Sequence, residues 1–278
     1  GLVFGKAGIQ KFRGEQRAGI QFMPDQTLRV MSHGYVPSEI ANEIEFPPSL
    51  ARLWHLRGYY GSLKHNVRGI YAYYLGWYDG NPATLDSLPP RDLARRTLQY
   101  MGGVEAVLTR AHADYVAGDY RWVVHILDQV IWAEPDNMAA RELAAAAHTQ
   151  MGYGAENPTW RNAYLSAANE LRVGLPKGDK NHRVLRDVLK GMSPLLLMNS
   201  LSIRLNGPKA AGLAFTINWC IAGTDESCHS ELSNAVLNNR EGLDPHAILS
   251  ITLPREMLSD FSLGHITSEG IQGPDVMF

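Results

Sequence analysis

The stretch Leu213-Ala-Phe-Thr-Ile-Asn-Trp-Cys-Ile221 decides the fold of the C-terminal third of this 278-residue chain. Its large apolar residues stand at every second position, which is the period of a strand with one face in the core. The same alternation returns from Ala247 to Leu253, and an apolar helical run from Pro194 to Leu205 precedes both strands. Residues 191–278 are therefore predicted to form a small α+β domain with a mostly antiparallel sheet.

The sequence between these two strands is weaker in pattern. Residues Ser227 to Leu237 fit a strand pair, and a turn is predicted near Asn238-Asn239. The two cysteines of the chain, Cys220 and Cys228, lie in the same neighbourhood. Two half-buried thiols in neighbouring strands and a disulfide both fit this placement, so the pairing of the cysteines stays open.

The sequence before this domain changes to the 3.6-residue period that is typical of helices. Residues 25–152 are therefore predicted to form an all-helical domain. The spacing from Gly118 to Pro135 fits either one tetratricopeptide-type unit or an ordinary pair of antiparallel helices. The two clearest apolar stripes are Val67, Ile70, Tyr71 and Tyr74, and then Val123, Ile126, Leu127 and Val130.

Two segments flank the helical domain. Residues 1–24 include Gly5, Gly8, Gly14 and Gly19, which each disfavour a helix interior, and end at Pro24, so an irregular lead-in is predicted there. Residues 153–190 are predicted to contain a helix, Thr159–Arg172, and a polar linker. The chain does not begin with Met and has no signal-peptide layout, which we interpret as a break point in a longer protein.

The composition is that of an ordinary globular protein, with 45% hydrophobic and 19% charged residues. A formal net charge of −2 argues against a nucleic acid held by bulk charge. The sequence has no apolar run of membrane-spanning length, so no membrane insertion is expected. The compartment stays open between the periplasm or secretion and the cytoplasm.

Motifs of complete enzymes are missing from the sequence. Ten histidines are present, yet no two stand at the His-x-His or His-x-x-x-His spacing of metal sites. There is no Cys-x-x-Cys pair, and no nucleophile elbow or phosphate-binding loop. No metal ligand and no catalytic residue is therefore predicted within this chain.

The segment from Arg57 to Pro82, RGYYGSLKHNVRGIYAYYLGWYDGNP, carries the highest density of hydrogen-bond donors. Hydroxyl, imidazole and guanidinium groups all donate to oxyanions, so one interpretation is a site for an anion such as sulfate. The other is a helix core whose tyrosine hydroxyls cap backbone groups. The residue pattern by itself leaves both open. The donors are Tyr59, Tyr60, His65, Asn66, Arg68 and Tyr71.

Several long motifs resemble the metallo-β-lactamase-type alkylsulfatases, which hydrolyse dodecyl sulfate. The most specific is Arg57-Gly-Tyr-Tyr-Gly-Ser-Leu-Lys-His-Asn66, followed by Tyr74-Leu-Gly-Trp-Tyr-Asp-Gly-Asn-Pro82. Asp25–Tyr35, Phe46–Arg52 and Arg204–Ala211 are also similar to the family. The resemblance covers about residues 25–265.

This resemblance implies a domain plan. The family begins with a metallo-β-lactamase domain that holds two zinc ions through an HxHxDH motif, carboxylates and a further histidine. That motif is absent here, so the two zinc ions are expected on a missing N-terminal domain, and no cofactor is expected on this chain. Residues 25–152 would be the helical dimerisation domain of a homodimer. Residues 191–278 would resemble sterol carrier protein 2 and receive the alkyl chain.

The resemblance also implies site residues. In the family, the segment rich in Tyr and His reaches the zinc cleft and helps to hold the sulfate, which makes Tyr60, His65 and Tyr71 the candidates here. Independently of the resemblance, an apolar cleft for an alkyl ligand in residues 191–278 could be lined by Phe215, Trp219 and Leu253. All three also fit an ordinary core.

The resulting expectation is the C-terminal part of a zinc-dependent alkylsulfatase. It would bind a long-chain alkyl sulfate or alcohol, and it would not turn over substrate by itself. The alternative is a stand-alone lipid- or alkyl-binding module with a helical protein-interaction domain. A helical scaffold without a ligand is a third reading, supported only by the tetratricopeptide-like unit.

Overall fold

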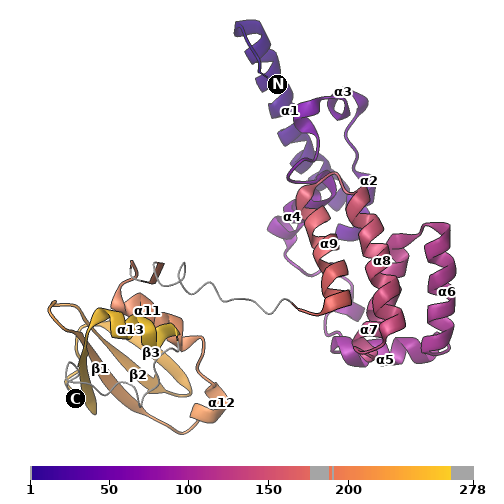
Figure 1. Cartoon of the computed structure of the whole chain (residues 1–278). Coiled ribbons are helices and arrows are strands. Elements are labelled where there is room, and N and C mark those ends of the chain that lie inside the picture. The colour runs from indigo at the N-terminus through magenta and orange to yellow at the C-terminus, as the bar shows by residue number, and fades with distance from the viewer. Residues whose placement is uncertain (1, 176–187, 190, 264–278) are drawn as a thin grey trace. The chain divides into compact units, whose positions relative to one another are not determined.

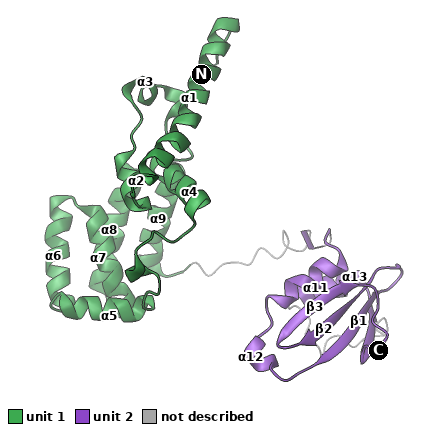
Figure 2. Cartoon of the chain, turned by 180° about the vertical axis from the view of Figure 1, so that it is seen from behind, with its two compact units in different colours: residues 1–176 green, residues 177–278 purple. Residues whose placement is uncertain are grey.

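The computed structural model describes residues 2–175, 188–189 and 191–263. The chain divides into two compact units, residues 1–176 and 177–278, which are coloured separately in Figure 2. The first is all-helical and the second combines helices with one sheet (Figure 1). The fold class predicted from the sequence is therefore confirmed. None of the described helices is long and apolar enough to cross a membrane.

The first half of unit 1 is a block built on one long helix. Five helices form it: α1 (Lys6–Met31), α2 (Pro37–Glu43), α3 (Pro48–Ala51), the 3-10 helix η1 (Trp54–Leu56) and α4 (Leu63–Leu75). Residues from α1, α2 and α4 share one core, and the N-terminal turns of α1 extend beyond it (Figure 1). This core contains Val30, Ile40, Ala41, Ile44, Val67 and Tyr71.

Helix α1 corrects the prediction of an irregular lead-in over residues 1–24. The helix begins at Lys6 and runs through Pro24 without a break. Packing explains why Gly19 does not interrupt the helix, because this residue is buried against Leu56. A Cβ at Gly19 would lie 2.7 Å from the Leu56 side chain, so any larger residue would force Leu56 to shift. Tertiary packing here outweighs helix propensity.

The second half of unit 1 is a block of paired helices. The 3-10 helix η2 (Pro82–Thr84) leads into α5 (Pro90–Tyr100), α6 (Val104–Ala117), α7 (Tyr120–Ala133), α8 (Met138–Gly154) and α9 (Pro158–Val173). Helices α7, α8 and α9 pack side by side in chain order (Figures 1 and 2). The predicted apolar stripe is confirmed, because Val123, Ile126, Leu127 and Val130 are all buried.

Turn and cap chemistry sets the ends of these helices. Gly118 is left-handed and ends α6, and the Asp119 side chain then caps α7. Asn137 and Asn157 cap α8 and α9 in the same way, each accepting a hydrogen bond from the third residue after it. Helix α9 belongs to unit 1, whereas the sequence placed it in a junction. Most of the predicted linker lies outside the described residues.

Unit 2 is a four-stranded mixed sheet with helices packed on one face (Figure 1). The strands are β1 (Phe215–Ile221), β2 (Ser227–Ser233), β3 (Val236–Glu241) and β4 (Leu249–Leu253), in the order β3-β2-β1-β4. Two pairings are antiparallel, and β1 pairs with β4 in parallel. The described helices are α11 (Pro194–Ser202), α12 (Gly207–Ala210) and α13 (Arg255–Leu263).

Two details of the sheet settle open points of the sequence. The turn between β2 and β3 lies at Asn234-Ala235, both with positive φ, whereas it was predicted at Asn238-Asn239. Those two asparagines lie inside β3 and pair with β2. Cys220 and Cys228 are both free thiols. Because Cys228 stands opposite Trp219, the two cysteine side chains point to opposite faces of the sheet.

Candidate functional site

The largest cavity among the described pockets lies between α4 and α9, and we call it the α4–α9 cavity. Its volume is about 750 Å³. One wall comes from the loop before α4 and the first turns of that helix. The other comes from the start of α9, about ninety residues later in the chain. The lining residues are Tyr60, Gly61, Ser62, His65, Asn66, Arg68, Asn157, Thr159, Trp160, Ala163 and Tyr164.

Side chains from the start of α9 hold the loop before α4 in place. The Asn157 Nδ2 donates a hydrogen bond to the carbonyl oxygen of Tyr60, and the Thr159 hydroxyl approaches the same oxygen at 3.3 Å. Beside them, the Arg57 guanidinium pairs with the Glu156 carboxylate at 2.6 Å. These links join the two blocks of unit 1 at the cavity and fix the backbone that carries Tyr60.

Two helix N-termini meet at this cavity. The Ser62 hydroxyl caps α4 by accepting from the backbone N–H of His65 at 3.2 Å. The Asn157 Oδ1 caps α9 by accepting from the N–H of Trp160 at 2.9 Å. Helix N-termini carry partial positive charge and unpaired N–H groups, which favours an anion. Arg68 adds a full positive charge, and none of the described lining residues is a carboxylate.

Aromatic rings form the second chemical feature of the cavity. The imidazole of His65 meets the Trp160 ring edge-on at 6.4 Å between centroids, and Trp160 meets Tyr164 at 6.4 Å in the same manner. Tyr164 in turn stacks on His148 of α8 at 5.9 Å. The cavity therefore combines donors for an anion at the helix ends with an apolar aromatic wall.

The structure brings together two of the three predicted sulfate contacts. Tyr60 and His65 both line the α4–α9 cavity. Tyr71 does not, because its side chain is 4% exposed and lies in the core with Val67. Asn157 and Trp160 were missed, although the Asn-Pro cap and the aromatic pair four residues apart on α9 were visible signals.

The predicted alkyl cleft is not assembled by its three candidates. Trp219 and Leu253 lie in the core of unit 2, and the Trp219 indole N–H donates to the Ser230 hydroxyl at 3.0 Å. Phe215, at the start of β1, is half-buried. A cavity of about 340 Å³ in unit 2 is lined by other residues, with Asp225, Glu226 and Glu241 among them.

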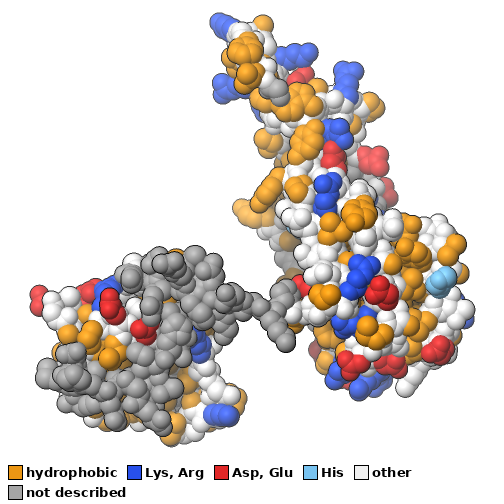
Figure 3. Space-filling view, viewed as in Figure 1, with side chains coloured by type: hydrophobic (Ala, Val, Ile, Leu, Met, Phe, Trp, Pro, Cys, Tyr) orange, Lys and Arg blue, Asp and Glu red, His pale blue; other side chains and the backbone are white. Residues whose placement is uncertain are grey.

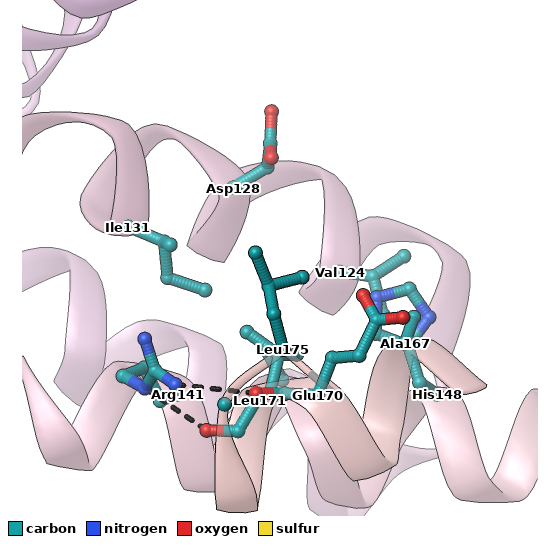
Figure 4. Close-up of a pocket in the computed structure, with 11 residues that line it drawn as sticks. Val124, Asp128, Ile131, Arg141, His148, Ala167, Glu170, Leu171 and Leu175 are labelled. Carbon is teal, nitrogen blue, oxygen red and sulfur yellow. Dashed lines mark hydrogen bonds between the residues drawn. The ribbon is translucent and has the colours of Figure 1, made fainter. Parts of the chain in front are cut away.

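A further cavity of about 360 Å³ lies between α7, α8 and α9 (Figure 4). Its Arg141 is already engaged, because the guanidinium donates to the carbonyl oxygens of Leu171 and Glu170. Burial raises the pKa of Asp128, which the nearby His125 partly offsets. Two carboxylates, Asp128 and Glu170, line this cavity, so its charge disfavours an anion.

His148 is the unusual group of this further cavity. Its Nδ1 is buried without a hydrogen-bond partner among the described atoms. Burial lowers the pKa of His148 below its ordinary value, and the charge of Asp128 opposes this in part. The ring is therefore neutral near pH 7.

The arrangement of potential metal ligands is the last feature of the site. Within the described ranges, no group of three or more His, Cys, Asp or Glu side chains is placed to hold a metal ion. The zinc ions that the family resemblance implies therefore find no ligand set in this part of the chain.

Two protein-family models match this chain. Residues 36–174 match the family model for alkyl sulfatase dimerisation, and residues 183–275 match the one for the alkyl sulfatase C-terminal domain. The chain is 41% identical over 263 residues to the alkyl/aryl-sulfatase BDS1 of Saccharomyces cerevisiae. It is 40% identical over 266 residues to a linear primary-alkylsulfatase of Pseudomonas sp..

A solved structure is similar over nearly the whole chain. It is the stereoselective inverting sec-alkylsulfatase Pisa1 from Pseudomonas sp., with 35% identity and a TM-score of 0.89. The match covers 99% of this chain and 44% of that one. The chain likewise spans about 40% of the length of the two curated relatives. This chain thus belongs to the alkylsulfatase family, and it carries the family's dimerisation and C-terminal domains.

Proposed function

We propose that this chain binds the sulfate end of a long-chain alkyl sulfate in the α4–α9 cavity and serves a zinc-dependent alkylsulfatase. The observation that carries the proposal is the meeting of two capped helix N-termini with Arg68, in a cavity whose described lining holds no carboxylate. Such an arrangement favours an oxyanion by partial charge and by direct donors. His65 and Tyr60 supply further donors.

The aromatic wall supports the alkyl part of the ligand. Trp160 and Tyr164 stand next to the donors, so an apolar tail can leave the anion site along their rings. Ligand sites of this kind combine a few placed polar groups with an apolar lining. A volume of about 750 Å³ leaves room for more than a sulfate group. The same cavity would accept the alcohol product more weakly, because the alcohol lacks the negative charge.

The remaining parts of the proposal concern the assembly. We propose that unit 1 forms a homodimer, that its helix pairs are tetratricopeptide-like, and that residues 191–278 are a sterol-carrier-like domain for the alkyl chain. The matched dimerisation model supports the first part. Hydrolysis would need the metal-binding domain of the family, so this chain supplies binding and positioning rather than the metal chemistry.

A binding titration tests the anion site. Octyl sulfate is added below its micelle concentration, and tryptophan fluorescence and calorimetry follow the binding. Replacing Arg68 by glutamine removes a charge-assisted contact and should weaken binding about tenfold. The matched control is Arg110→Gln, since Arg110 is exposed on α6 and is not among the residues that line the cavity. Equal affinity of the two variants, or no binding at all, would overturn the proposal.

A turnover assay tests whether the hydrolysis depends on a domain outside this chain. The chain is incubated with dodecyl sulfate and added zinc, and released sulfate and bound metal are measured. We expect no sulfate release. Zinc-dependent release would show that the chain holds a metal site of its own and would refute the assignment of the chemistry to another domain.

A further inference from the structure

A second, smaller cavity adjoins the α4–α9 cavity, and we call it the His55 cavity. Its volume is about 180 Å³. Three residues, Gly61, Ser62 and Asn66, belong to the linings of both cavities. The rest of the lining comes mainly from α1, from η1 and from the loop that follows η1. Sites for drug-sized ligands have volumes of roughly 300–1,000 Å³, so the His55 cavity fits a small ion rather than an alkyl chain.

The imidazole of His55 is the unusual group of this cavity. Its side chain is only 6% exposed, and its Nε2 lies 3.5 Å from the Glu15 carboxylate. The rings of Phe12 and Trp54 pack against it, with centroids 4.5 and 5.4 Å away. The Nδ1 atom is buried and has no hydrogen-bond partner among the described protein atoms. Because a buried polar atom without a partner is costly, Nδ1 is a preformed contact for a ligand in the cavity.

The Glu15 carboxylate determines what Nδ1 can offer. A carboxylate beside Nε2 places a proton on that nitrogen. The protonated ring then presents its second N–H, at Nδ1, to the cavity. His55 is thereby oriented as a hydrogen-bond donor toward an anion, and the two aromatic neighbours keep the ring in this orientation.

Further donors line the same cavity. Ser62 caps the N-terminus of α4, where the helix carries partial positive charge, and its hydroxyl proton can be donated. The Asn66 Nδ2 contacts the Met23 sulfur at 3.6 Å, which is a weak acceptor. Arg57 brings a positive charge, which it shares with Glu156. None of the described lining residues is a carboxylate, so the cavity favours an anion.

Helix α1 adds positive charge around this cavity. It contains five Lys or Arg residues and two acidic residues, and four of its residues line the cavity. Lys6, Lys11, Arg13 and Arg17 are exposed along its N-terminal part. Lys and Arg side chains gather on this part of α1 in the space-filling view (Figure 3). Their field attracts a small anion and counters the negative charge of Glu15.

We propose that the His55 cavity binds inorganic sulfate, the anion that hydrolysis of an alkyl sulfate releases. The proposal deepens the proposed function and rests on it, because the sulfate would come from an ester held in the α4–α9 cavity. Since the two linings share Gly61, Ser62 and Asn66, ester and product would bind next to each other. His55 is then a binding residue for the product through Nδ1.

Calorimetric titration of the full chain with sodium sulfate, against sodium chloride at equal ionic strength, tests the proposal. His55→Phe keeps a ring against Phe12 and Trp54 but removes both nitrogens, so the sulfate affinity should fall at least tenfold. His55→Asn keeps an N–H donor near the place of Nδ1 and should retain part of the affinity. The matched control is His112→Phe, which should bind as the wild type does, because His112 is exposed on α6 and lines neither cavity.

The outcomes separate this inference from the proposed function. Equal sulfate affinity of the wild type and of folded His55→Phe, or no sulfate binding at all, would overturn the His55 cavity and leave octyl sulfate binding standing. Sulfate binding that depends on His55 without any octyl sulfate binding would refute the proposed function and the product role with it. Tighter binding of phosphate than of sulfate would also contradict the product role. Far-UV circular dichroism checks that each variant is folded.

Octyl sulfate titrations at rising sulfate concentrations give an independent reading that needs no variant. If the two anions occupy neighbouring cavities, sulfate should lower the octyl sulfate affinity only to a plateau, because the coupling between two sites is finite. If both compete for one site, the affinity keeps falling as sulfate increases, and a separate product site is refuted.

Discussion

Replacing Asn157 by alanine tests how the two blocks of unit 1 are joined. The side chain is buried, caps α9 at the N–H of Trp160, and donates to the carbonyl oxygen of Tyr60. Losing an asparagine cap costs about 1 kcal/mol. Removing the donor from the Tyr60 carbonyl costs about another 1 kcal/mol. This is the low end of the usual cost of an unpaired buried acceptor, because the Thr159 hydroxyl, 3.3 Å from the same oxygen, still offers a donor. The free energy of unfolding should fall by about 2 kcal/mol.

Two comparison variants separate the two contributions. Asn157→Asp keeps an acceptor for the cap but turns a carboxylate oxygen toward the Tyr60 carbonyl oxygen, so at least about 1 kcal/mol should be lost. Asn137→Ala removes the cap at the N–H of Ala140 at the start of α8, together with an exposed hydrogen bond from Asn137 Nδ2 to the Glu134 carboxylate. Urea unfolding followed by tryptophan fluorescence measures all three, because five of the six tryptophans lie in unit 1.

The same variants should also differ in their affinity for octyl sulfate. Asn157→Ala frees the loop that carries Tyr60, so the affinity for octyl sulfate should fall. Asn137→Ala leaves that loop untouched and should bind as the wild type does. If Asn157→Ala costs no more stability than Asn137→Ala, the link to Tyr60 contributes nothing and the account of the cavity wall is refuted.

Three further predictions concern stability and use the same unfolding assay. Leu127→Ala, at a fully buried position of α7, should cost about 3–4 kcal/mol, and a loss below 1 kcal/mol would contradict its place in the core. Gly152→Ala should destabilise, because its Cβ would lie 2.7 Å from Leu165, whereas Gly69→Ala meets open space within α4 and should stabilise by about 0.5–1 kcal/mol. The half-buried His148, whose Nδ1 is buried, has a lowered pKa, so the unfolded chain takes up the proton first and stability falls as pH drops below about 6.5. Unfolding curves at pH about 7 and about 5.5 measure this decrease in the free energy of unfolding, and His148→Gln should make it smaller. An unchanged decrease in the variant would exclude His148 as its source.

Local periodicity predicted much of the fold. The alternation from Leu213 to Ile221 corresponds to β1, and the stripe around Leu127 corresponds to the buried face of α7. Both succeeded because the large apolar residues of each element lie on one face and pack in a hydrophobic core, so the pattern is strong. The position of the β2–β3 turn, at Asn234-Ala235, was predicted wrongly because its local signal is weak. It has two positive φ values but no glycine, which is the residue that usually signals such a turn.

The candidate site shows where sequence reasoning stops. Tyr71 was chosen as a sulfate contact through the family resemblance, yet the helical stripe shared with Val67 already indicated the core, where both lie. His65 is on the opposite side of that helix and lines the cavity. Trp160 could not be connected to His65, because the ninety-odd residues between them return to the same place only through the packing of α5 to α9.

The placement of the α4–α9 cavity affects how unit 1 unfolds. The two hydrophobic clusters of unit 1 have no residue in common, and the cavity lies where the loop of one block meets the helix of the other. A bound molecule touches both blocks, so mass action makes it resist their separation. Amide hydrogen exchange in α2 and in α7 should then slow together on saturation. An alkyl sulfate is a detergent that unfolds proteins at high concentration. At low concentration, binding in the α4–α9 cavity would instead hold the two blocks of unit 1 together and stabilise the folded protein.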